Sequence, residues 1–271
     1  MERLARSPGL FALMLLAVLG EWLWRRRFAR LGYDGRGALA SLAVGLGHAV
    51  VGVLSASVLG GLFVALAWVA PVHWSMRDGR VWLVAFLAVE LAYYLVHRAS
   101  HTMRWMWATH AVHHTPEQMT LLSAIRLGWT HLLSLGWLGY LPLVLVGFDP
   151  RMVFALLAFN LHYQFFLHTE AVGRLGPLEW VFNTPAHHRV HHGSNAAYLD
   201  CNYGGVLIVF DRLFGTLRTE RADDPVRYGL ARPLGTFNPL RLVFRPWRQL
   251  IMDMRATGSV GGALKIALGR P

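Results

Sequence analysis

Residues 37–72 contain no Asp, Glu, Lys or Arg, an uncharged run of 36 residues. As one straight helix this run would be roughly 54 Å long at ~1.5 Å per residue, whereas the hydrocarbon core of a bilayer is ~30 Å thick. The run also contains the glycine pairs Gly45/Gly47 and Gly60/Gly61. We therefore expect a tilted, kinked or re-entrant membrane segment, which crosses the bilayer either once or twice.

Other apolar runs complete a membrane bundle. Residues 8–24 precede the cationic cluster Arg25, Arg26 and Arg27, which predicts a short anchor with its carboxyl end in the cytoplasm. Residues 81–96 form another run, and residues 129–148 and 152–167 predict a tight helical hairpin. The expected fold is all-α, with about four to five membrane segments and a cytosolic helical cap.

The composition supports this class and excludes others. Hydrophobic residues make up 55% of the chain and charged residues only 15%, which excludes disorder, and the single cysteine, Cys201, excludes a disulfide scaffold. The net charge of +11 fits the positive flanks of a membrane protein better than a nucleic-acid-binding surface, so we expect no nucleic-acid partner. We divide the chain into an anchor with its basic flank (1–36), a membrane-embedded catalytic domain with its cap (37–240) and a basic amphipathic tail (241–271). The tail is either an interfacial helix on anionic lipid or a helix packed on the cap.

Ten of the 14 histidines gather in three clusters and one single position. Residues three or four apart share a helix face, and imidazole is a neutral ligand suited to Fe, Zn, Cu and Ni. So many imidazoles at one membrane face would be hard to keep neutral and hydrogen-bonded without a metal. The other four, His48, His73, His131 and His162, are interpreted as core or interfacial residues. The predicted metal ligands are His97, His101, His110, His113, His114, His168, His187, His188, His191 and His192.

The side of the membrane on which the clusters lie follows from the number of crossings. If residues 37–72 cross once, every cluster lies with Arg25–Arg36 on the cytoplasmic side, and if they form a hairpin the clusters share the opposite side.

A membrane metal-binding or transport protein would distribute its ligands through the spans, whereas here they gather at span ends. A structural zinc site needs only four ligands, so nine or ten nitrogens indicate a pair of metals.

Polar residues beside the clusters are candidates for positioning the imidazoles. Asn160 and Gln164 share a helix face with His168, and Glu90 shares one with His97. An intramembrane acid is by default a functional candidate, although a hydrogen bond elsewhere in the bundle would also explain Glu90. The remaining candidates for the same orienting role are Glu170, Asp200 and Asp211.

The histidine series carries a resemblance to a known family. H-x3-H at 97–101, H-x2-HH at 110–114 and HH-x2-HH at 187–192, followed by DCNYGG at 200–205 and DRLFGT at 211–216, resemble the fatty acid hydroxylase/sterol desaturase superfamily and its alkylglycerol monooxygenase branch. The resemblance implies an enzyme, an integral-membrane di-iron oxygenase acting on a lipid, with the ten histidines as ligands and His187 as a tenth or supporting member. Two iron ions are implied as cofactor, with zinc as a substitute in purified protein.

The resemblance also leaves choices open. Thr102 stands where that branch has a Glu, so carotenoid or aminolipid substrates remain alternatives to an ether lipid. Desaturation begins with the same hydrogen abstraction as hydroxylation, so a desaturase is the alternative reaction. The sequence has no haem motif, cysteine cluster or dinucleotide fingerprint, and so we expect electrons from a donor protein or a diffusible reductant.

Overall fold

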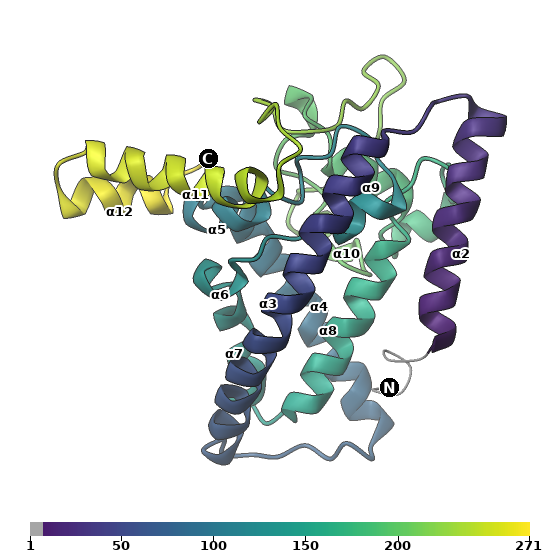
Figure 1. The fold of residues 1–271 in the computed structure, drawn as a ribbon. Helices are drawn as coiled ribbons and strands as arrows, with labels where there is room; N and C mark the ends of the chain where they lie inside the picture. The colour runs from purple at the N-terminus through teal and green to yellow at the C-terminus, as the bar shows by residue number, and fades with distance from the viewer. Residues whose placement is uncertain (1–7) are drawn as a thin grey trace.

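Three long helices form the membrane part of the computed structural model, which describes residues 8–271 (Figure 1). They are α2 (Pro8–Trp24, extended by a π-helical turn, Arg25–Ala29), α3 (Gly35–Trp68) and α4 (Gly79–Thr102). Each is long and apolar enough to cross a membrane. Over residues 8–271 the chain forms helices and only isolated β-bridges, which agrees with the expected all-α class. Residues 1–7 of the predicted anchor lie outside the described residues.

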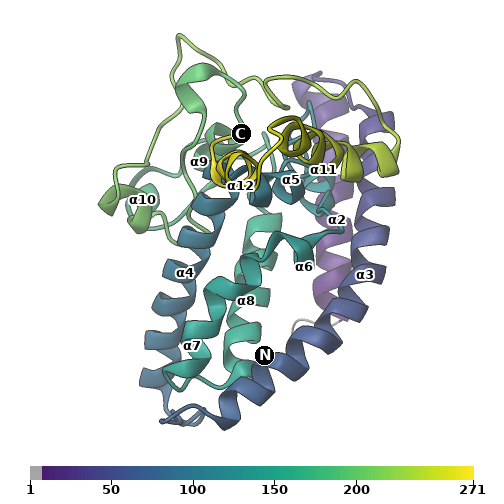
Figure 2. The same ribbon diagram turned by 90° about the vertical axis from the view of Figure 1, so that its left-hand side faces the viewer.

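Helix α3 is one continuous helix of 34 residues that runs from the cap to the opposite end of the bundle (Figure 2). The re-entrant hairpin is therefore wrong, since residues 37–68 lie in one helix that is long enough to cross a membrane once. The first of its two glycine pairs, Gly45/Gly47, lies in close packing, whereas Gly60 and Gly61 have open space around them. A Cβ at Gly47 would collide with the ring of Trp129, and one at Gly45 would lie 3.0 Å from the carbonyl oxygen of Ile125.

The expected hairpin has one regular arm and one broken arm. The return arm is α8 (Pro150–Phe165), which begins where the Asp149 carboxylate accepts a hydrogen bond from the Arg151 amide at 2.8 Å. The first arm is divided into α6 (His131–Ser134), a 3-10 turn (Gly136–Tyr140) and α7 (Leu141–Leu145). Leu135 has a φ of +62°, which ends α6 and changes the chain direction, so no single helix can span residues 129–148.

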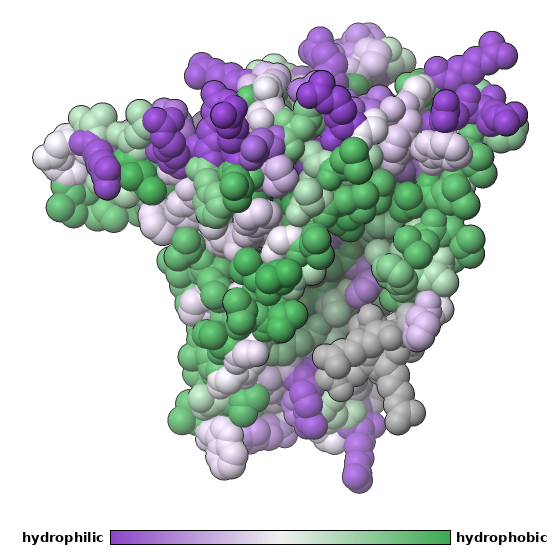
Figure 3. Space-filling model, in the orientation of Figure 1, coloured by the Kyte–Doolittle hydropathy of each residue, from purple (hydrophilic) through white to green (hydrophobic). Residues whose placement is uncertain are grey.

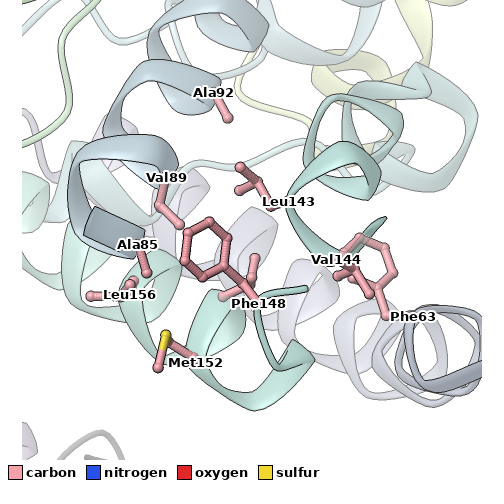
Figure 4. Packing of buried hydrophobic residues seen from close by; sticks show 10 residues of the cluster. Phe63, Ala85, Val89, Ala92, Leu143, Val144, Phe148, Met152 and Leu156 are labelled. Carbon is pink, nitrogen blue, oxygen red and sulfur yellow. The ribbon is translucent and has the colours of Figure 1, made fainter. Parts of the chain in front are cut away.

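The core lies where α4, α7 and α8 meet the lower half of α3. Figure 4 shows apolar side chains from all four helices pointing toward one another. The outer surface of these helices is also apolar, and Figure 3 shows it as a belt beneath a hydrophilic rim. Helices that are apolar on both the side facing the core and the side facing outward are typical of a membrane bundle. The buried set comprises Phe63, Ala85, Val89, Ala92, Leu143, Val144, Phe148, Met152, Val153 and Leu156.

The cap gathers at the end of the bundle where α2, α4 and α8 finish (Figure 1). Its helices are α5 (Arg104–His110), α9 (Pro185–His191), α10 (Val209–Leu213) and the 3-10 turns Leu121–Ile125, Gly176–Trp180 and Ala196–Tyr198. Arg25 is buried at this end, in an ion pair with Glu170 of the cap. The cationic flank and the histidines therefore share one side, as a single crossing by α3 predicts.

The tail forms two helices, α11 (Pro239–Ala256) and α12 (Val260–Leu268), which project sideways at the level of the cap (Figure 1). Trp247 and Leu250 of α11 pack on Ala108 of α5. The indole N–H of Trp247 donates to the Thr130 hydroxyl at 2.7 Å. The tail is thus attached to the cap along one face.

Candidate metal centre

Nine of the ten predicted ligands converge in two adjoining groups. Within each group one ligand atom from every side chain lies within 4.8 Å of all the others. The groups share a boundary, because the rings of His114 and His192 stack with their centroids 4.4 Å apart. Four stretches of chain supply them: the end of α4, α5 with its following turn, the residues after α8, and α9. The first group is His97, His101, His110, His114 and His191, and the second is His113, His168, His188 and His192.

Backbone carbonyls fix the orientation of three of these rings. Nδ1 of His97 lies 2.8 Å from the carbonyl oxygen of Tyr203, and Nδ1 of His191 lies 2.9 Å from that of Cys201. Nδ1 of His168 lies 2.7 Å from the carbonyl oxygen of Gln164. A carbonyl oxygen only accepts, so Nδ1 carries the proton in each ring. Each Nε2 therefore keeps its lone pair for a metal, which is the usual arrangement of a ligating histidine.

The spacing of the free nitrogens fits a coordinated ion. Nε2 of His168 lies 3.1 Å from Nε2 of His113 and 3.0 Å from Nε2 of His188. Two nitrogens bound at right angles to one ion at ~2.1 Å would lie ~3 Å apart. In the first group, Nε2 of His191 is buried with no hydrogen-bond partner among residues 8–271. A metal ion would satisfy these nitrogens, so the donor set fits two metals.

The electrostatics of the cluster favour neutral imidazoles. Burial, which disfavours charge, lowers the pKa of His168 to about 3 and the pKa of His191 to about 4. Burial and then repulsion from neighbouring histidines lower the pKa of His188 and His192 well below the ordinary value. Metal binding needs unprotonated imidazole, so the fold holds its ligands in the form that a metal requires.

His187 lies in neither group. It occupies the first turn of α9, and its buried Nδ1 has no partner among the described residues. The Thr184 hydroxyl accepts a hydrogen bond from the His187 amide at 3.5 Å and Pro185 follows at the first helical position, which is a common way for a helix to begin. The structure thus separates His187 from the nine converging imidazoles.

Glu90 holds a loop and makes no hydrogen bond to an imidazole. Its carboxylate accepts from the amides of Val206 and Leu207 at 2.8 and 2.9 Å, and from the Asn160 side chain at 2.6 Å. The Asn160 oxygen in turn accepts from Gln164. Glu90 therefore anchors the chain just after Tyr203, whose carbonyl orients His97, and acts on the ligand through the backbone.

None of the other three acidic candidates, Asp211, Asp200 and Glu170, makes a hydrogen bond to an imidazole among the described residues. Asp211 accepts from the amides of Tyr203 and Gly204 at 2.8 and 2.7 Å, and burial raises its pKa. Asp200 Oδ1 lies 3.9 Å from Nδ1 of His101, beyond hydrogen-bond range. Glu170 binds Arg25 and accepts from the Tyr228 hydroxyl at 3.1 Å, and so it connects α2 to the cap.

Sequence reasoning missed the orienting role of the Cys201 and Tyr203 carbonyls, because every residue has a carbonyl and only its direction matters. Asp200 and Asn202 have φ values of +57° and +55°, which turn the Cys201 and Tyr203 carbonyls toward the histidines. The Asn202 side chain donates to the carbonyl oxygens of His187 and Arg218. Asx residues tolerate positive φ better than most others, so the alternating Asp and Asn were the available signal.

Two pockets reach the metal ligands from different sides. One, of about 470 Å³, is largely apolar, is lined by α2, α3 and α8, and reaches His97, His110, His113 and His168. The other, of about 510 Å³, lies in the cap, is lined by Asp200, Arg232 and Arg270, and reaches His101, His114 and His191. The centre is thus accessible from the membrane side and from the cap side.

Comparison with known proteins gives consistent results. The fatty acid hydroxylase family model matches residues 82–216. Alkylglycerol monooxygenase of Xenopus tropicalis is 38% identical over 242 residues, covering 86% of this chain and 50% of the relative, and that of Danio rerio is 50% identical over 157 residues, covering 58% and 34%. Ornithine lipid hydroxylase of Rhizobium tropici is 32% identical over 147 residues, covering 54% and 44%.

The chain spans between about a third and a half of the length of the alkylglycerol monooxygenases it matches. No solved structure matches it. The matched region contains all nine converging imidazoles, together with the loop that orients them. The chain therefore belongs to the fatty acid hydroxylase superfamily, on its alkylglycerol monooxygenase-like branch.

Proposed function

We propose that this protein is a membrane-bound di-iron monooxygenase that hydroxylates a lipid with O2 and electrons from an external donor. The observation that carries the proposal is the pair of histidine groups, in which Nδ1 of three rings faces a carbonyl oxygen and Nε2 atoms of neighbouring rings face one another. The curated relatives named as lipid monooxygenases and hydroxylases support the same reaction class. When bound, a pair of redox-active irons would supply the activation of O2 needed to oxidise a C–H bond.

The residues of the chain would divide the work. The nine imidazoles would hold the metals, with four or five nitrogens for each ion. Glu90 and Asp211 would keep the 203–207 segment in place, so that the Tyr203 carbonyl holds His97 in its ligating orientation. The apolar pocket would bring a lipid chain to His97, His110, His113 and His168 and exclude water from the metal centre. The cap pocket would admit the electron donor.

We further propose that the metal centre faces the cytoplasm. Arg25 lies at the cap end of the bundle, Arg26, Arg27 and Arg36 follow it in sequence, and cationic flanks are retained on the cytoplasmic side. A reporter that functions only in the cytoplasm, fused after α12, should be active. A reporter that functions only outside the cytoplasm and is active at the same position would contradict this orientation.

Metal content and lipid products test the function directly. Purified protein should contain about two iron atoms per chain, or zinc after overexpression, by elemental analysis. Lipid extracts from cells with and without the gene should differ by one added oxygen in a lipid, whereas loss of two hydrogens would identify a desaturase instead. A metal content near zero would contradict the proposal.

A further inference from the structure

Two histidines outside the metal groups line the apolar pocket that leads to them. His48 of α3 and His162 of α8 are both half-buried and both lie within the helical bundle. Imidazole is costly to place in a bilayer and usually has a functional partner there. The sequence alone interpreted both as core or interfacial residues, and the fold places them on a pocket that reaches the predicted metal ligands.

The hydrogen bonds of these two side chains fix which ring nitrogen remains free. Nδ1 of His48 lies 3.0 Å from the carbonyl oxygen of Gly128, and Nδ1 of His162 lies 2.6 Å from that of Ala158. A carbonyl oxygen only accepts, so in a neutral ring the proton is on Nδ1. Each Nε2 is then a bare acceptor, and neither Nε2 has a hydrogen-bond partner among residues 8–271.

The pocket opens toward the lipid-facing side of the bundle. Leu161, on its rim, is 51% exposed, and Figure 3 shows the apolar face hollowed between α3 and α2. The lining is otherwise dominated by apolar groups such as Met14, Ile125 and Phe165. A hydrocarbon chain fits such a lining, whereas two unpaired acceptors need hydrogen-bond donors.

We propose that this pocket binds the lipid substrate from within the bilayer, and that His48 and His162 select lipids carrying alcoholic hydroxyl groups by accepting their hydrogen bonds. This inference rests on the proposed function, because it treats the ligand of the pocket as the molecule that is oxidised. It adds two specificity-determining residues outside the metal site. It also predicts weaker binding of lipids whose hydroxyls are replaced by groups that accept hydrogen bonds but cannot donate them.

The test compares two probes on purified full-length, metal-loaded protein in detergent without O2. The first is radiolabelled 1-monooleoylglycerol, which has two free hydroxyls, and the second is its di-O-methyl ether, which has the same chain and no donor. Wild-type protein should bind the diol more tightly. His48→Phe and His162→Phe should each weaken diol binding about 3- to 10-fold, as expected for one lost hydrogen bond, and leave binding of the diether unchanged.

His73→Phe is the matched control, since His73 is exposed, also bonds a backbone carbonyl, and lies outside the pocket. It should change neither affinity. Equal binding of the two probes to wild-type protein, or equal loss of both in the His48 and His162 variants, would overturn the inference. Turnover of a lipid without diol preference would refute this inference alone, and diol preference without any oxygenated product would refute only the proposed function.

Discussion

The two pockets differ in chemistry although both end on metal ligands. The membrane-side pocket has mainly apolar walls with isolated imidazole acceptors, and the cap-side pocket has an acid and two arginines at its mouth. The membrane-side pocket reaches imidazoles of both metal groups, whereas the cap-side pocket reaches imidazoles of the first group only, so the two metal positions face different surroundings. Because the two pockets are separate, an apolar molecule could reach the histidine centre from the bilayer and a polar molecule could reach it from water by different routes.

Removing a ligand should have the largest effect, because it acts on the centre that both pockets share. His113→Ala, facing the membrane-side pocket, and His191→Ala, facing the cap, should each reduce turnover more than ~100-fold, since even the loss of a residue that only supports a ligand costs 10–100-fold. Metal per chain, measured by elemental analysis, should fall with activity while membrane insertion is retained.

His187→Ala is the control for ligand removal, because His187 lies on the same helix as His191 but in neither metal group. It should retain both metals. Loss of metal in this variant, or wild-type activity in either ligand variant, would contradict the assignment of ligands.

The second-largest effect is expected from acid, which should lower the folding stability of the metal-free protein. The unfolded chain takes up protons near the ordinary histidine pKa of ~6.5, whereas the folded pKa values of His168 and His191 are about 3 and about 4. The unfolded state therefore binds more protons between these limits, and stability is complete above ~6.5 and is lost as the pH falls below it. The melting temperature of metal-free protein should fall steeply from pH 7 to pH 5. A constant melting temperature over this range would show that the imidazoles are not held in the buried cluster.

The sequence predicted which imidazoles converge because helical spacing puts residues three or four apart on one face. His97 with His101 and His188 with His192 needed only this rule. It did not predict the broken arm, since an apolar run such as residues 129–148 looks alike whether it is one helix or several. The left-handed Leu135 depends on tertiary packing, which propensity does not encode.

The role of Glu90 also depended on long-range contacts. Its spacing from His97 suggested an imidazole partner, but the amides that it binds belong to residues more than 100 positions later. The position of His48 and His162 on one pocket likewise depended on tertiary contacts, because nothing in the sequence indicates that α3 and α8 line the same pocket. Local pattern predicted the converging histidines, and only the tertiary fold places the residues that support and surround them.

Filling one pocket at a time would separate their roles. Ala124→Phe in the membrane-side pocket should raise the KM for lipid roughly 10- to 100-fold, since an overpacked site costs ~1–3 kcal/mol. Ala231→Phe in the cap pocket should leave that KM unchanged and slow reduction by the electron donor. Steady-state kinetics with the lipid concentration and the donor concentration varied in turn would measure the KM for lipid and the dependence of the rate on the donor. Equal effects of the two variants on lipid KM would mean that the pockets form one path.

The smallest effect is expected from Asp200→Asn at the mouth of the cap pocket. Asp200 is 36% exposed and lies 3.9 Å from both Nδ1 of His101 and the Arg270 guanidinium, so its interactions are weak and screened. The variant should change metal affinity by less than ~10-fold, because an exposed ion pair contributes about 0–1 kcal/mol. Competition with a metal chelator measures this change. A larger loss would mean that Asp200 moves to within hydrogen-bond range of His101 when metal binds, and that the cap-side mouth helps to build the centre instead of only giving access to it.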